Sequence, residues 1–159
     1  MSKALVAYFS AEGHTAKVAK SLAKQADADL FEIAPQVPYT AADIKWTNPL
    51  SRCNKEMLGK KDVPVAGEIS GFEEYELVYI GFPIWYYGAP NIINTFIKQY
   101  DWSGKRIALF ATSGGSDISR AAAKLSIMLG DSGDIVSSLL VKPSDSPETL
   151  RAWIEIFSE

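Results

Sequence analysis

The sequence predicts an α/β domain: a three-layer, doubly wound fold with a five-stranded parallel sheet between helices. Two observations carry this prediction. Five short apolar runs alternate with segments that repeat apolar residues at helical spacing, and several of the runs are continuously apolar. Continuous runs are typical of parallel strands that are covered on both faces, whereas half-exposed strands alternate apolar with polar residues. Strands that alternate with helices favour a parallel sheet with right-handed crossovers.

The elements follow one another regularly along the chain. The expected strands are residues 4–9, 30–33, 77–82, 107–111 and 136–141. Apolar residues recur at intervals typical of amphipathic helices in residues 18–26, 92–100, 118–129 and 150–157. Ser146 and Pro147 place an N-cap hydroxyl before a proline, so we expect the last helix to begin at Pro147.

The connection from residue 34 to residue 76 is longer than one crossover helix requires. It contains four of the eight prolines, and residues 49–59 have the pattern of a short helix. The chain has no internal repeat and no low-complexity linker, and its 159 residues suffice for one core. We therefore expect a single domain over residues 1–159.

Composition restricts the partners and the location. The chain has 19 acidic and 16 basic residues, a formal net charge of −3, which argues against nucleic acid as a partner. No apolar stretch is long enough to span a membrane, and the short apolar run after Lys3 does not form a signal peptide. We expect a cytoplasmic protein with no membrane association. The single cysteine, Cys53, cannot form an intramolecular disulfide, and we expect a structural role for it.

Ligands of open parallel sheets bind beyond the carboxyl ends of the strands, so the turns there are of interest. The first turn, SAEGHT at residues 10–15, leads directly into a helix. Gly13 permits a close backbone approach, Ser10 and Thr15 offer hydroxyls, and a helix N-terminus attracts anions. The turn predicts a phosphate site, although Thr15 acting only as a helix cap is the alternative. The sequence has neither a Walker loop nor a dinucleotide-binding glycine motif.

The second turn, GFPIWYYGAP at residues 81–90, contains three consecutive aromatic residues beside Gly88. Trp85, Tyr86 and Tyr87 cannot all face a core, so at least one is expected to be exposed or to cover something flat. An aromatic side chain stacks well on a planar ring system. The alternative is that these residues close the sheet edge and form a protein interface.

The third turn, ATSGGSD at residues 111–117, has two glycines flanked by hydroxyl residues. Its exposed backbone amides can hydrogen-bond the polar edge of a ligand. The alternative is a turn that Ser116 or Asp117 caps at the start of the next helix. A phosphate turn, an aromatic turn and an amide-rich turn at one sheet edge together suit flavin mononucleotide (FMN).

The three turns resemble those of the flavodoxins, specifically the short-chain flavodoxin-like flavoproteins with a PIW turn and a TSGG turn. The resemblance extends from FSAEGHT through PIWYYGAP and FATSGGSDI to the last helix. It implies the strand order 2-1-3-4-5 and one noncovalent FMN, with the phosphate on the first turn, the isoalloxazine beside the second and its polar edge on the third. The cofactor-binding residues that it implies are Ser10, Ala11, Glu12, Gly13, His14, Thr15, Pro83, Ile84, Trp85, Tyr86, Tyr87, Gly88, Thr112, Ser113, Gly114, Gly115 and Ser116.

Two residues depart from the phosphate turn [ST]-x-T-G-x-T of that family. Glu12 replaces its middle threonine, and because a carboxylate repels a phosphate dianion, we expect the Glu12 side chain to turn outward. His14 either donates to the phosphate as an imidazolium or is exposed at the helix start, and we favour exposure. Its backbone amide is expected to bind in both cases.

The resemblance implies electron transfer through the flavin, which carries the redox chemistry. The three turns contain no evident catalytic residue, so we expect a monomeric electron carrier that serves a reductase and an electron acceptor, both proteins, and binds no metal. The alternative is an FMN-dependent NAD(P)H:quinone or azo reductase, in which the 34–76 segment with Tyr39 and Trp46 covers the flavin. A module that binds a phosphorylated ligand without redox chemistry is a third possibility.

Overall fold

A computed structural model of the chain describes residues 3–10, 13–36, 51–52, 65–84, 89–112, 118–130, 132–141 and 147–157. Five parallel strands form one sheet in the order β2-β1-β5-β6-β7. They are β1 (Lys3–Tyr8), β2 (Asp29–Glu32), β5 (Tyr75–Pro83), β6 (Lys105–Thr112) and β7 (Gly133–Val141). Numbered within this sheet alone, the order is 2-1-3-4-5, so the predicted fold class and strand order are confirmed.

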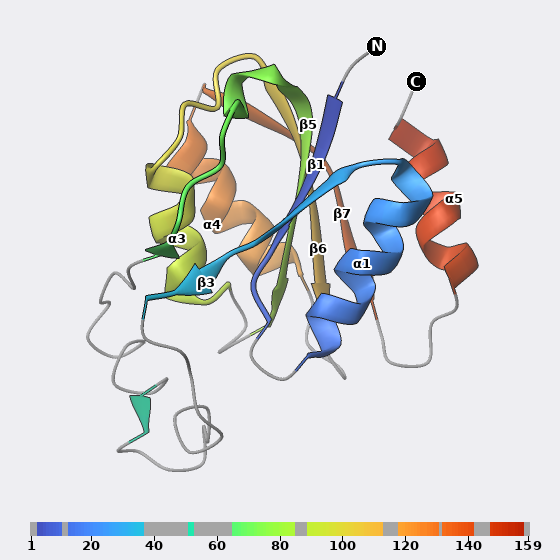
Figure 1. Cartoon of the computed structure of the whole chain (residues 1–159), viewed down its shortest axis with the longest axis horizontal. Helices are drawn as coiled ribbons and strands as arrows, with labels where there is room; N and C mark the ends of the chain where they lie inside the picture. The colour runs from blue at the N-terminus through green and yellow to red at the C-terminus, as the bar shows by residue number, and fades with distance from the viewer. Residues whose placement is uncertain are drawn as a thin grey trace.

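Helices cover both faces of this sheet, as Figure 1 shows. Helices α1 (His14–Ala26) and α5 (Pro147–Phe157) pack on one face, and α3 (Asn91–Lys98) and α4 (Ser119–Leu129) pack on the other. Helix α5 begins at Pro147, as the sequence predicts. No helix in the described part of the chain combines the length and the apolar character that a membrane span requires.

Some elements differ from the prediction. Strand β7 begins at Gly133, three residues earlier than its apolar run suggests, because Gly133 and Asp134 pair with the start of β6 at a sheet edge. A small antiparallel sheet of β3 (Ala34–Pro35) and β4 (Val65–Ala66) was not predicted, since two residues are too few for a periodic pattern. The helix expected within residues 49–59, and Cys53, lie outside the described residues except for positions 51 and 52.

Side chains alternate between the two faces along each central strand and so build two cores. Leu5 and Ala7 of β1 belong to the core under α3 and α4, whereas Val6 and Tyr8 belong to the core under α1 and α5. Because both faces are covered, every one of these four positions is buried, and residues 4–9 therefore form a continuously apolar run.

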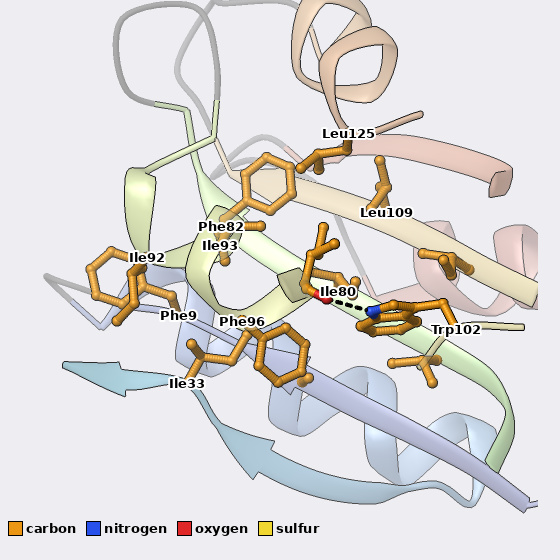
Figure 2. Packing of buried hydrophobic residues seen from close by; sticks show 14 of the residues in the cluster. Phe9, Ile33, Ile80, Phe82, Ile92, Ile93, Phe96, Trp102, Leu109 and Leu125 are labelled. Atoms are coloured by element: carbon orange, nitrogen blue, oxygen red, sulfur yellow. Dashed lines mark hydrogen bonds between the residues drawn. The ribbon is translucent and has the colours of Figure 1, made fainter. Parts of the chain in front are cut away.

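The core under α3 is rich in aromatic and branched residues (Figure 2). Phe96 of α3 is fully buried there, and the indole of Trp102 meets its ring edge-on at 5.9 Å between centroids. Trp102 Nε1 donates to the carbonyl oxygen of Ile97 at 2.8 Å. This hydrogen bond satisfies the one polar atom of a 2% exposed tryptophan side chain, as burial requires.

A buried lysine closes the amino-terminal edge of the sheet. Lys105, the first residue of β6, is 6% exposed, and its Nζ donates to the carbonyl oxygens of Phe72 (2.9 Å) and Tyr75 (2.6 Å). The short 3₁₀ helix η1 (Phe72–Glu74) supplies the first of these acceptors, and the ammonium lies 4.6 Å from the centroid of the Phe72 ring. Burial lowers the pKa of Lys105, and the charges of nearby carboxylates act in the opposite direction. The acceptors that stabilise the Lys105 ammonium are thus backbone carbonyl groups of the fold itself.

Candidate functional site

The register of the sheet brings the carboxyl ends of three neighbouring strands to one edge. Tyr8 at the end of β1 pairs with Gly81 of β5, and Pro83 at the end of β5 pairs with Thr112 at the end of β6. The three turns that the sequence singles out follow these strands, so they start together. In Figure 1 this edge is the lower one, where α1 also begins.

Gly13 shapes the first turn. It is the N-cap residue of α1 and has a φ of 96°, a left-handed conformation that favours glycine. Its amide donates to Ser10 Oγ at 3.0 Å, so the Ser10 oxygen stabilises the turn while its hydroxyl proton stays available. A Cβ added at Gly13 would meet no atom of the described chain within 4 Å, which shows that the turn faces open space there.

Helix α1 begins with free amides that point toward this edge. The first helical hydrogen bond runs from Lys17 N to Gly13 O at 3.2 Å, so the amides of His14, Thr15 and Ala16 have no acceptor within the helix. The first turn of α1 carries no acidic residue that would neutralise the positive end of its dipole. Free amides and a positive dipole end together favour an anion such as a phosphate.

Thr15 is the second residue of α1 and is 1% exposed. Its Oγ1 lies 2.7 Å from the Oγ1 of Thr112, a hydrogen bond between residues 97 positions apart. Since the N-cap of α1 is Gly13, Thr15 is not the helix cap that was the alternative interpretation. Instead, its hydroxyl joins the first turn to the end of β6. His14, by contrast, is exposed at the first position of the helix.

The second and third turns are also joined where they begin. The amide of Ile84, directly after β5, donates to the carbonyl oxygen of Thr112 at 3.2 Å. Ile84 is partly buried against the core under α3 and α4. Thr112 therefore contacts the first turn through its hydroxyl and the second through its carbonyl group.

The structure thus describes seven of the predicted site residues and brings Thr15 and Ile84 each into direct contact with Thr112. The remaining residues of the prediction, like Tyr39 and Trp46, lie outside the described residues. These predicted site residues are Ala11, Glu12, Trp85, Tyr86, Tyr87, Gly88, Ser113, Gly114, Gly115 and Ser116. Their roles stay predictions.

Gly81 is a residue whose importance sequence analysis missed. A Cβ at this position would lie 2.0 Å from the Phe110 ring, so only glycine lets β5 and that ring approach each other. The two residues are register partners on neighbouring strands. Gly81 therefore fixes the position from which the second turn leaves the sheet, and only its place in the GFP sequence at the strand end hinted at this.

Comparisons with known proteins agree with this geometry. The model of a protein family described as flavodoxin matches residues 3–157. The chain belongs to the flavodoxin family. A search of curated proteins gave no match to this flavodoxin-family chain.

Solved structures resemble this flavodoxin-family chain over its whole length. A candidate flavoprotein from Bacteroides uniformis is 42% identical, with 97% of this chain and 98% of that chain covered and a TM-score of 0.91. A second, from Bacteroides eggerthii, is 38% identical over 100% and 99% of the two chains, with a TM-score of 0.89. A flavoprotein from Lactobacillus acidophilus, solved in complex with FMN, shares the fold at 20% identity, with 100% of both chains covered and a TM-score of 0.79.

The described part of this flavodoxin-family chain holds no group of three or more His, Cys, Asp or Glu residues arranged to bind a metal ion. The described site residues are instead small, hydroxyl-bearing or apolar, apart from the exposed His14. Such an arrangement offers neutral hydrogen-bond donors and a helix dipole. It is suited to binding and orienting an anionic ligand.

Proposed function

We propose that the chain binds FMN at the carboxyl-terminal edge of its sheet and carries electrons between redox partner proteins. The observation that carries this proposal is the Thr15–Thr112 contact, which joins two of the three predicted turns beside the open N-terminus of α1. Membership of the flavodoxin family supports it, as does the FMN complex of the Lactobacillus acidophilus protein, which has the same fold.

The phosphate of FMN would be held by the start of α1. The amides of His14, Thr15 and Ala16 are free to donate, and the hydroxyl of Thr15 lies beside them. A Cβ built on the left-handed Gly13 would meet no described atom within 4 Å, so the space beside this glycine is open. The first helical turn of α1 contains no acidic residue, so no side chain of that helical turn repels a dianion.

When bound, FMN supplies a redox centre that accepts and releases electrons. The chain's own residues would orient its ring, because the 3.2 Å hydrogen bond from Ile84 N to Thr112 O joins the two positions from which the second and third turns leave the sheet. The predicted ring contacts are Pro83 to Gly88 beside the isoalloxazine and Thr112 to Ser116 at its polar edge.

A carrier is favoured over an enzyme with its own substrate by the chemistry of the described site. Ser10, Thr15 and Thr112 are engaged with one another or with the turn backbone, and the one imidazole among the described site residues, that of His14, is exposed. No described group is placed as a general acid or base. We propose a monomer that accepts electrons from a reductase and passes them to an acceptor protein.

The test is to titrate the purified protein with FMN and then reduce the complex stepwise with dithionite without oxygen. We expect stoichiometric binding, followed by two resolved one-electron steps, and no NAD(P)H oxidation by the complex alone. A single two-electron step together with rapid NAD(P)H oxidation in the presence of a quinone would instead support the reductase alternative. Failure to bind FMN would contradict the cofactor itself.

A further inference from the structure

Thr112 is the one described residue that contacts the other two turns of the site. Its Oγ1 lies 2.7 Å from Thr15 Oγ1, and its carbonyl oxygen accepts from Ile84 N at 3.2 Å. In the sheet it is paired with Pro83 on one side and Val141 on the other. The backbone of Thr112 is thus fixed on both sides, and its hydroxyl is aimed at the start of α1.

A hydrogen bond between two hydroxyls uses only one of their two protons. If Thr15 donates to Thr112, Thr15 turns only lone pairs toward any other group. If Thr112 donates to Thr15, the Thr15 proton remains free for a second acceptor. Thr15 is 1% exposed, so bulk water is not that acceptor. An anion bound at the start of α1, next to the free amides, would supply an acceptor for this proton.

The charge of the ligand decides between the two directions. A phosphate monoester dianion at the start of α1 repels the lone pairs of a hydroxyl and attracts its proton. The arrangement with Thr112 as donor and Thr15 as acceptor is therefore the one that a phosphate stabilises. In that arrangement Thr112 donates to Thr15 and Thr15 donates to the anion. Both protons then point toward the anion, and the two hydrogen bonds strengthen each other.

We propose that Thr112 is a positioning residue for the phosphate: its hydroxyl donates to Thr15 Oγ1 and thereby directs the Thr15 proton to a phosphate oxygen. This role rests on the proposed binding of FMN. It differs from the contact with the ring edge that the family resemblance implies for Thr112, since it acts on the opposite end of the ligand. It also links the phosphate site to Ile84, because the same residue carries both contacts.

The experiment compares FMN with riboflavin, the same flavin without its phosphate, in the full-length protein. The variants are Thr112→Val, which removes the hydroxyl while keeping the shape, Thr112→Ser, which keeps the hydroxyl, and Thr15→Val. Dissociation constants for both flavins are measured by quenching of flavin fluorescence. The matched control is Thr95→Val, because the Thr95 hydroxyl donates to the Asn91 carbonyl oxygen within α3, away from the three turns.

We expect Thr112→Val to weaken FMN binding by roughly threefold to tenfold, the effect of one hydrogen bond, and to leave riboflavin binding within about twofold. Thr112→Ser, which keeps the hydroxyl, should bind FMN as tightly as the unchanged protein does. Thr15→Val should weaken FMN binding by about tenfold or more, because it removes a hydrogen bond to a charged group. In the Thr15→Val background, Thr112→Val should have almost no further effect, since Thr112 acts through Thr15.

Equal losses for FMN and riboflavin in Thr112→Val would overturn the proposal in favour of a contact with the ring or a general structural role. Additive effects of Thr15→Val and Thr112→Val would also overturn it. If Thr112→Val does not fold, Thr112→Ala is subject to the same criteria. Equal losses and additive effects would each overturn the positioning role while FMN binding by the unchanged protein remained intact. Absence of FMN binding by the unchanged protein would instead overturn the proposed function and the positioning role together.

Discussion

At the amino-terminal edge of the sheet, Lys105 is buried and donates to two carbonyl oxygens of the fold, whereas at the carboxyl-terminal edge Thr15 and Thr112 share one hydrogen bond between two hydroxyls. The first edge contains a full charge, yet its acceptors are supplied within the chain. At the second edge the hydroxyl groups of Thr15 and Thr112 are uncharged, and this edge keeps a hydroxyl proton and three helix amides to donate. What distinguishes the proposed binding edge from the amino-terminal edge is the number of hydrogen-bond donors that have no acceptor within the described fold, rather than the amount of charge.

The packing of the two edges differs in the same sense. The ring of Phe72 lies 4.5 Å from that of Tyr100 and 4.9 Å from that of Trp102, and the Lys105 ammonium lies 4.6 Å from the centroid of the Phe72 ring. At the other edge, the hydroxyls of Thr15 and Thr112 contact each other at 2.7 Å. Substitutions at the two edges should therefore affect different properties: stability at the amino-terminal edge and flavin binding at the carboxyl-terminal edge.

The largest expected effect is that of Lys105→Met on stability. Methionine keeps the unbranched stem but removes the ammonium that donates to the carbonyl oxygens of Phe72 and Tyr75, and the Phe72 oxygen still accepts from Tyr75 N. We expect the free energy of unfolding to fall by about 2–4 kcal/mol, as for the loss of two buried hydrogen bonds from a charged donor. Chemical denaturation measures this loss. The control Lys124→Met removes the same charge from an exposed position of α4 and should change stability by less than about 0.5 kcal/mol.

FMN affinity of folded Lys105→Met should equal that of the unchanged protein. A clear loss of affinity would break the comparison, because it would mean that the amino-terminal edge takes part in binding. Equal stability of Lys105→Met and Lys124→Met would show that the buried contacts of Lys105 contribute little.

A pair of glycine substitutions sharpens the comparison at a smaller scale. Gly13 and Gly104 both have positive φ, 96° and 75°, and open space beside them, but they lie at opposite edges of the sheet. Alanine at either position should lower the free energy of unfolding by about 1 kcal/mol through backbone strain alone. Only Gly13→Ala should also weaken FMN binding, because it shifts the amides at the start of α1. Equal FMN affinities of the two variants would remove Gly13 from the site.

The smallest effect concerns Tyr75, which is 8% exposed and donates to Asp29 Oδ2 at 2.6 Å. Burial, then the hydrogen bond and charge of Asp29, then the charge of Glu74, raise the pKa of Tyr75 to about 12. The unfolded chain loses this proton near pH 10. Between these values the folded state holds more protons, so stability falls as pH rises through the window from about 10 to about 12.

Tyr75→Phe should remove this part of the pH dependence while leaving that of the other groups. The measurement is the difference in unfolding free energy between the two proteins at pH 9 and at higher pH. Parallel curves for the unchanged protein and the variant would show that the Tyr75–Asp29 contact does not perturb the titration of Tyr75.

Local patterns were sufficient to predict the five strands of the parallel sheet and the helices α1, α3, α4 and α5, because both faces of that sheet are covered and the apolar runs are therefore unbroken. The turn at Gly13 was also predictable, since a glycine between hydroxyl residues before a helix is a local signal. The contact between Thr15 and Thr112 was not, because the residues are 97 positions apart and only the strand register brings them together. Lys105 was missed for a similar reason: a lysine before an apolar run suggests an exposed strand end, and nothing nearby shows that its acceptors lie 30 and 33 residues earlier.

The most direct test of where the flavin binds is a two-dimensional amide NMR spectrum of the labelled protein, recorded while FMN is added. We expect the largest shifts at the amides of Gly13, Thr15 and Thr112, with the indole signal of Trp102 at the opposite edge unchanged. Large shifts at Trp102 and Lys105, with Gly13 and Thr15 unmoved, would contradict the assignment of the carboxyl-terminal edge as the binding site.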